Sequence, residues 1–214
     1  DVWFRSRGFS LHYDRGMENH YFLISRGQAL GLRIEVMQGK LPGDPRLADD
    51  WNTRRWRDDH PLGIEGLLSV DVSVESLDHA RKVFGEQLQW PVLSQRSLPE
   101  EGAQGLAFDA GDVVVEALQA DDDASALAAH ASNVRGICGI TFKVRSAQAA
   151  WDHLRGCGFT LIGSPATRFA IAPPEAQDRL IWFSEAIPEA WPAPRSRLRQ
   201  PAEFPDVDVP AEDS

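Results

Sequence analysis

The feature that most constrains the fold is an internal repeat. From Gly66 the sequence reads as a strand (GLLSVDVSV), a helix (LDHARKVFGEQL) and three further strands (PVLSQRS, GLAFDA and DVVVEAL). Apolar residues recur first at every second position and then at three- and four-residue spacing, as these elements require. The same order returns in GICGITFKV, AQAAWDHLRGCG, FTLIG, RFAIA and RLIWFSE. The repeat therefore predicts an α+β fold of βαβββ modules at residues 64–120 and 137–185, which form cupped mixed sheets.

The N-terminal residues predict part of another module. Residues 1–39 contain four strand-like runs (DVWFRS, GFSLHYD, NHYFLIS and LGLRIEVM) and no visible helix, as the last strands of a module would. A partial module leaves sheet edges unpaired. We therefore expect either residues upstream of Asp1 or the second subunit of a homodimer to complete it.

Three other segments show no sustained periodicity. Residues 40–63 and 121–136 are expected to be linkers. Residues 186–214 contain many prolines and too few apolar residues to order themselves alone, which predicts a flexible tail. Trp191 and Phe204 are the residues expected to anchor this tail.

Composition excludes several classes of partner. A net charge of −10 disfavours nucleic acid and anionic membrane surfaces, since both bind clustered cations. No apolar run approaches the length of a membrane span, and nothing indicates a signal peptide. Cys138 and Cys157 lack metal-type spacing and do not indicate a disulfide framework, so we expect a reducing cytoplasm. No Gly-x-Ser-x-Gly elbow or phosphate-binding glycine loop is present.

The junction between the first strand and the helix carries a resemblance to a known family. It has the pattern V-x-V-x-S-L-D-x-A, formed by Val72, Val74, Ser76, Leu77, Asp78 and Ala80. The fourth strand of the same module contains Glu116 followed by an apolar residue. With the repeat, these features resemble the vicinal oxygen chelate superfamily, which includes glyoxalase I, bleomycin-resistance and extradiol-dioxygenase proteins. The resemblance covers residues 64–185 and implies a cupped sheet around a shared site.

The resemblance also implies a divalent metal (Fe, Mn, Ni or Zn). Its ligands would be His or Gln on the first strand and Glu on the fourth strand of each paired module. In this sequence those positions carry Ser69 and Glu116 in one module and Gly139 and Trp182 in the other. Only Glu116 is a good ligand, because a serine hydroxyl binds these metals poorly and glycine and indole offer no donor. The sequence therefore favours a metal-free pair at residues 64–185.

A metal-dependent dioxygenase, lyase or isomerase stays open as the alternative. Its site would join the partial module to the first complete one and would also use upstream residues. The metal ligands in this chain would be Glu35, Glu116 and His20, with His12 able to contribute. Equally, Glu35 and Glu116 can each be a strand carboxylate that meets an arginine such as Arg33 or Arg96.

Without a metal, a concave sheet remains that can hold a planar or apolar small molecule. Ser69, Glu116 and Arg168 are its candidate polar groups, and Phe108 and Trp182 are the aromatic residues we expect to contact the ligand. Further aromatic residues fit either the lining or the core: Trp151, Phe169, Phe183, Trp3, Phe4, Tyr21 and Phe22. The sequence thus predicts a glyoxalase-like protein of unassigned reaction that binds a small, largely apolar molecule between its modules.

Overall fold

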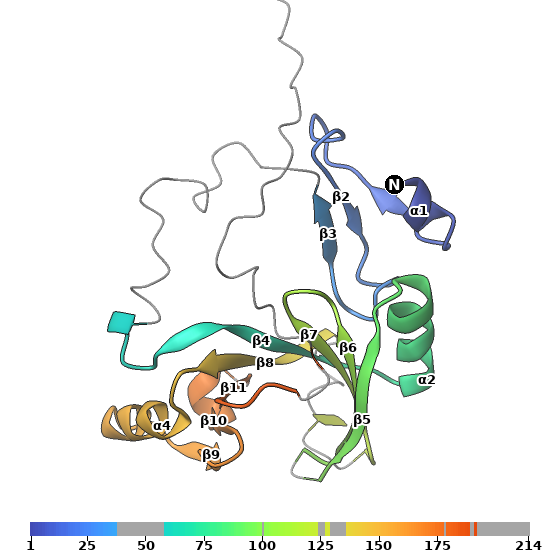
Figure 1. The fold of residues 1–214 in the computed structure, drawn as a ribbon. Helices are drawn as coiled ribbons and strands as arrows, with labels where there is room; N and C mark the ends of the chain where they lie inside the picture. The colour runs from blue at the N-terminus through green and yellow to red at the C-terminus, as the bar shows by residue number, and fades with distance from the viewer. Residues whose placement is uncertain are drawn as a thin grey trace, which may run out of the picture.

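The chain folds into two sheets in a computed structural model, which describes residues 1–37, 58–99, 101–123, 127–128, 136–177, 179–188 and 191. A small antiparallel sheet contains β1 (Leu11–His12), β2 (Tyr21–Ile24) and β3 (Ile34–Met37). The other sheet has eight strands in the order β5-β6-β7-β4-β8-β11-β10-β9 (Figure 1). Among the described residues, no helix has the length and apolar character that crossing a bilayer requires.

The eight-stranded sheet consists of the two predicted βαβββ modules. The first contains β4 (Ile64–Ser73), α2 (Leu77–Ala80) with its π-helical continuation η3 (Arg81–Gln87), β5 (Val92–Leu98), β6 (Ala103–Asp109) and β7 (Val114–Ala120). The second contains β8 (Gly136–Val144), α4 (Ala147–Gly156), β9 (Leu161–Gly163), β10 (Phe169–Ile171), the 3₁₀ turn η4 (Pro173–Ala176) and β11 (Leu180–Ser184). The predicted fold class is therefore confirmed.

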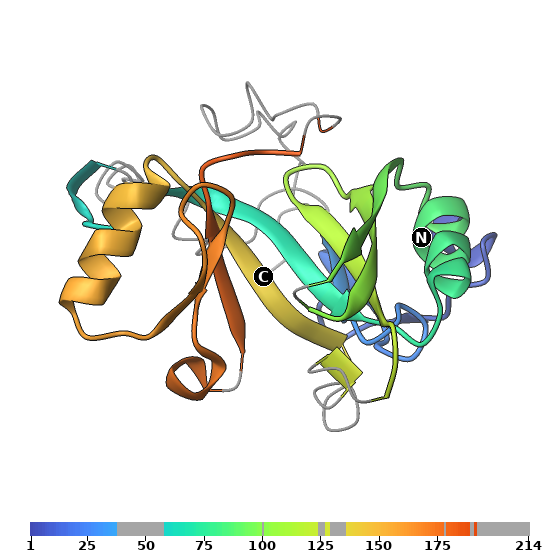
Figure 2. The ribbon, with the colours of Figure 1, turned by 90° about the horizontal axis from the view of Figure 1, so that it is seen from below.

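The first strands of the two modules meet at the centre of the sheet. β4 and β8 pair antiparallel, while β7 lies parallel to β4 and β11 lies parallel to β8. The helices lie at opposite ends of the molecule, as Figure 2 shows. Strand register makes the modules equivalent position by position: Asp71 pairs with Glu116, as Thr141 pairs with Trp182.

The apolar core lies on the helix-covered face of the sheet. Phe84 and Phe108 pack edge to face with ring centroids 5.5 Å apart, in a cluster that also contains residues of the N-terminal sheet. In the second module, Trp151, Phe169 and Phe183 belong to the cluster under α4. Because neighbouring strand residues point to opposite faces, the side chains between these aromatic residues face the other side.

The first residues of the chain differ from the prediction. Val2–Arg5 form a short helix, α1, where the run DVWFRS predicted a strand. The helical turn lets Phe4 pack on Phe9 and Phe22, with ring centroids 6.3 and 5.2 Å apart. These contacts outweigh the weak strand signal of so short a segment. The other three predicted N-terminal runs contain β1, β2 and β3.

Equivalent serines cap the helices of both modules, and their substitution tests the repeat. The Ser76 hydroxyl accepts a hydrogen bond from the His79 amide, and the Ser146 hydroxyl accepts one from the Ala149 amide. We expect Ser76→Ala and Ser146→Ala each to lower the free energy of unfolding by about 1 kcal/mol in urea denaturation. Ser76→Asp keeps an acceptor and should stay near wild type. A loss at only one of the two serines would contradict equivalent caps.

Candidate functional site

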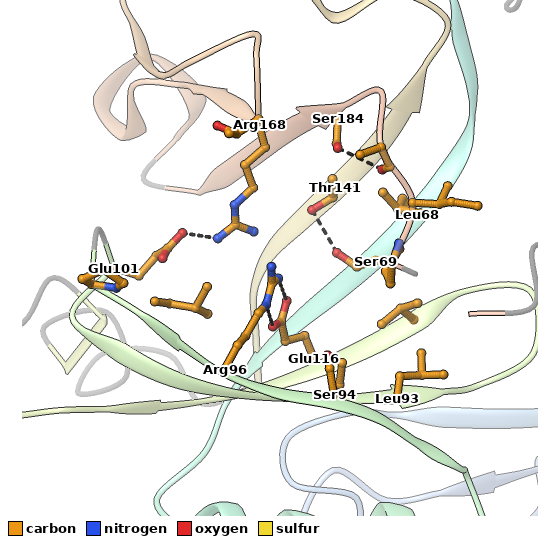
Figure 3. A pocket seen from close by; sticks show the side chains of 18 of the residues that line it. Leu68, Ser69, Leu93, Ser94, Arg96, Glu101, Glu116, Thr141, Arg168 and Ser184 are labelled. Atoms are coloured by element: carbon orange, nitrogen blue, oxygen red, sulfur yellow. Dashed lines mark hydrogen bonds and ion pairs between the residues drawn. The ribbon is translucent and has the colours of Figure 1, made fainter. Parts of the chain in front are cut away.

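A cavity of about 1020 Å³ opens between the modules on the face of the sheet opposite the helices (Figure 3). In this view Leu68 and Leu93 lie at one end, while Glu101 and Arg168 lie at the other. The apolar end continues into a cluster of Leu68, Ala107, Val114 and Trp191. The Trp191 indole also donates a hydrogen bond to Asp109 at 3.3 Å, which anchors the segment after β11 on the first module.

The Arg96–Glu116 ion pair forms one polar group of the cavity. Nε and Nη2 of Arg96 bond the two oxygens of the Glu116 carboxylate at 2.8 and 2.7 Å. Glu116 is buried, whereas 48% of the Arg96 side chain is exposed. Gly105 lies between them on β6, where a Cβ atom would stand 2.7 Å from Glu116 Oε1. The glycine thus leaves the space in which this pair forms.

Arg168 forms the second polar group, on the opposite module. Its guanidinium carbon lies 4.3 Å from the centre of the Trp182 ring, and its Nη2 donates to Glu101. Arg168 and Glu101 are mostly buried, and 19% and 8% of their side chains are exposed. The contact with Glu101 joins the end of the β9–β10 connection of one module to the β5–β6 hairpin of the other.

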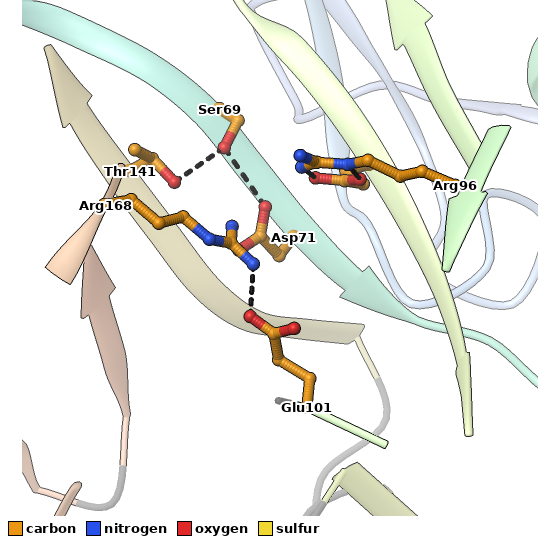
Figure 4. Close-up of polar contacts among 7 residues, drawn as sticks. Ser69, Asp71, Arg96, Glu101, Thr141 and Arg168 are labelled. Carbon is orange, nitrogen blue, oxygen red and sulfur yellow. Dashed lines mark hydrogen bonds and ion pairs between the residues drawn. The ribbon is translucent and has the colours of Figure 1, made fainter. Parts of the chain in front are cut away.

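Asp71 lies beneath the cavity and is 2% exposed. Its carboxylate accepts a hydrogen bond from the Ser69 hydroxyl at 3.1 Å, and that hydroxyl lies 2.9 Å from Thr141 Oγ1 (Figure 4). Burial, and secondly the negative charge of Glu116, raise the pKa of Asp71 to about 7 against the opposing effect of Arg168. A Cβ atom on Gly139 would stand 2.9 Å from Asp71 Oδ2, so glycine is needed here too.

The structure brings together three of the predicted ligand-contact residues. Ser69, Glu116 and Arg168 all line the cavity. Trp182 is 3% exposed and supports Arg168 from below. Phe108 does not reach the cavity, because its neighbour Ala107 takes the inward position on β6 and Phe108 packs in the core with Phe84. The expected contact at Phe108 is therefore wrong.

The remaining aromatic candidates also lie away from the cavity in the described part of the chain. Trp151, Phe169 and Phe183 pack in the core beneath α4. Phe4 and Phe22 pack against the N-terminal core, Trp3 lies under the guanidinium of Arg7, and the Tyr21 hydroxyl bonds Asp14. Five of these residues have the core role that was the alternative to the lining: Trp151, Phe169, Phe183, Phe4 and Phe22. Trp3, which is 39% exposed, and Tyr21 have neither role.

The residues at the implied metal positions do not fit a metal. Ser69 is hydrogen-bonded to Asp71, and Glu116 is held by Arg96 in the arrangement named above as its alternative role. Glu35 lies exposed on the separate N-terminal sheet, so it does not join Glu116 and His20 in one site. Within the described ranges, no group of three or more His, Cys, Asp or Glu residues could hold a metal ion. The set Glu35, Glu116 and His20 is not assembled.

Sequence reasoning did not single out Asp71, Glu101 or Thr141. Asp71 follows Ser69 by two residues in an alternating strand, so the period that predicts an inward Ser69 also predicts an inward Asp71. A carboxylate on the inward row of this strand was the available signal. Glu101 gave none, because its contact with Arg168 spans 67 residues and depends on how the modules pack.

Two βαβββ modules that share a central strand pair and a cavity define the glyoxalase type of fold. Residues 70–172 match the sequence model of the Glyoxalase/Bleomycin resistance protein/Dioxygenase superfamily. The predicted resemblance to the vicinal oxygen chelate superfamily is therefore confirmed for the module pair.

Solved structures support the same fold. The methylmalonyl-CoA epimerase of Mycobacterium tuberculosis superposes with a TM-score of 0.51 at 20% identity, over 56% of this chain and 87% of the epimerase. A methylmalonyl-CoA epimerase in complex with methylmalonyl-CoA and NH4+ gives 0.50 at 16% identity, over 58% and 98% of the two chains. At these identities the likeness concerns the fold alone. None of the curated proteins matches the sequence significantly.

The space at Gly105 can be tested by adding a methyl group. In Gly105→Ala the new Cβ atom would lie 2.7 Å from Glu116 Oε1, which forces the carboxylate away from Arg96. We expect the free energy of unfolding to fall by about 1–3 kcal/mol in urea denaturation. Gly66→Ala is the matched control, since its Cβ atom would meet nothing within 4 Å. Equal stability of the two variants would contradict this account.

The raised pKa of Asp71 predicts a dependence of stability on pH. Its pKa is about 7 in the folded chain against a reference of 3.8, so the folded state binds the proton more tightly. Between these values wild-type stability therefore falls as the pH rises. Asp71→Asn cannot ionise, so its stability relative to wild type should rise by up to about 1.4 kcal/mol per pH unit in this window.

Urea denaturation of wild type and Asp71→Asn at pH 5 and pH 8 measures this difference. Asp152→Asn, on the exposed side of α4, is the matched control. A relative stability of Asp71→Asn that is the same at both pH values, or lower at pH 8, would show that the carboxyl group is not held in this way.

Proposed function

We propose that this chain is a glyoxalase-like protein that binds a small, largely apolar molecule in the cavity between its modules, without a metal ion. The observation that carries the proposal is the Arg96–Glu116 pair. Glu116 is the one good ligand at the positions that the family resemblance implies, and both its oxygens are bonded to a guanidinium group. A carboxylate engaged in this way is unavailable as a ligand unless the pair breaks.

The form of the cavity supports a small organic ligand. Its volume of about 1020 Å³ is in the range of small-molecule sites in proteins. Leu68, Leu93, Val114 and Ile187 supply apolar surface. The guanidinium groups of Arg96 and Arg168 lie toward the Glu101 end, and serine hydroxyls lie among the leucines (Figure 3). Apolar walls with a few converging polar groups are the usual composition of such sites.

The solved relatives suggest a different ligand, which the charges of this cavity do not favour. Their names specify methylmalonyl-CoA, which carries a carboxylate and several phosphates. The two cations lining the cavity, Arg96 and Arg168, already have Glu116 and Glu101 as partners. Binding of a polyanion would leave negative charge without compensation. We therefore do not extend that substrate to this chain.

The proposal also includes a cytoplasmic location and the kinds of partner. Both cysteines are free, one buried and one exposed, which supports a reducing cytoplasm. Small molecules are the proposed partners, and nucleic acid and membranes are not. A homodimer whose second subunit completes the N-terminal sheet stays a prediction.

A blocked cavity tests the proposal. Ser94 lines the cavity from the edge strand β5, whereas the next residue, Gln95, bonds Arg81 on the helix-covered side. We expect ethylbenzene to bind wild type and Gln95→Trp with a Kd on the order of millimolar. Ser94→Trp should abolish binding, because the indole fills the cavity. Ligand-observed NMR measures both, and equal binding to the two variants, or none to wild type, would refute the proposal.

A further inference from the structure

Each module holds one arginine side chain at the same place in its fold. Strand register makes Glu116 of β7 equivalent to Trp182 of β11, since they pair with the equivalent residues Asp71 and Thr141. Glu116 binds the Arg96 guanidinium through two hydrogen bonds, and Trp182 lies under that of Arg168. Arg96 lies on β5, the second strand of its module, whereas Arg168 directly precedes β10, the third strand of the other module, so the repeat did not simply duplicate one residue.

Both guanidinium groups keep hydrogen-bond donors for a ligand. A guanidinium has five N–H groups. Arg96 uses its Nε and one Nη2 hydrogen for Glu116, which leaves three N–H groups. Arg168 uses Nη2 for Glu101, and the indole contacts the face of its guanidinium, so donors remain along the edge. Figure 3 shows the two side chains reaching into the cavity from opposite modules.

The charges at this end of the cavity restrict what these donors can bind. Each arginine already has a carboxylate partner, and Glu116 and Glu101 are both more than nine-tenths buried. A bound carboxylate would therefore add a negative charge that nothing at the site neutralises, which is costly in a partly buried place. An uncharged oxygen accepts the same hydrogen bonds and adds no charge.

We propose that Arg96 and Arg168 together bind an uncharged carbonyl oxygen of the ligand, whose apolar body lies against Leu68, Leu93 and Val114. The inference rests on the proposed function and adds the class of ligand: a neutral carbonyl compound with an apolar group. It also assigns the two arginines as the residues that select it. Hydrogen bonds from charged donors to a neutral acceptor are strong enough to decide such a choice.

Three probes of similar size separate the effect of a carbonyl group on affinity from the effects of the apolar body and of a negative charge. Acetophenone has a carbonyl group, ethylbenzene has none, and benzoate carries a charge. We expect wild type to bind acetophenone about tenfold or more tighter than ethylbenzene, and benzoate no tighter than acetophenone. Titration by ligand-observed NMR gives the three dissociation constants.

Variants of Arg96 and Arg168 then test whether these residues cause the tighter binding of acetophenone. Arg168→Gln should weaken acetophenone about tenfold and leave ethylbenzene within about twofold. Arg96→Lys keeps a positive charge beside Glu116, so the fold is retained, but it loses the planar fork and should also weaken acetophenone. Arg145→Gln removes an exposed arginine that is paired with Asp58 outside the cavity and is the matched control.

The possible results distinguish this inference from the proposed function. If ethylbenzene and acetophenone bind equally and neither arginine variant changes this, the arginine assignment fails while the binding function stands. Tighter binding of benzoate than of acetophenone would overturn the neutral ligand class. If no probe binds wild type, both proposals fail. Thermal denaturation confirms that each variant is folded before its affinity is compared.

Discussion

The antiparallel pairing of β4 with β8 is the interaction on which the rest of the structure depends. It joins the first strands of the two modules, with Ser69 opposite Thr141 and Asp71 opposite Gly139. Each module then adds its fourth strand in parallel on the outer side of its first. One strand pair therefore fixes which residues of both modules share a face, and that face carries the cavity.

Two carboxylates, those of Asp71 and Glu116, are buried on this face, and each packs against a glycine. A buried carboxylate is costly unless it is hydrogen-bonded or paired. Glu116 is paired with Arg96. Asp71 accepts a hydrogen bond from Ser69, and its pKa is raised to about 7. Gly105 and Gly139 supply the space for these two carboxylates, since a Cβ atom at either would lie within 3 Å of a carboxylate oxygen. The site therefore depends on these two glycines as well as on its charged side chains.

The sequence predicted the architecture well because the same order of strands and helix occurs in both modules. Element order and the family resemblance followed from periodicity and from the V-x-V-x-S-L-D-x-A junction. Faces were harder to assign on β6, where residues on both sides are buried. Alternation there shows that Ala107 and Phe108 face apart, but not which of them meets the helix. The helical turn at Val2–Arg5 likewise depends on contacts that Phe4 makes with distant residues.

The site was less predictable because its contacts cross between strands and modules. Glu116 reaches Arg96 across the glycine at position 105, and Arg168 meets Glu101 only because the modules face each other. The two arginines also differ in how firmly they are held. Two parallel hydrogen bonds fix both the position and the orientation of Arg96. Arg168 is held by contact with the Trp182 ring and by one hydrogen bond from its Nη2 to Glu101, and it is the more buried of the two side chains.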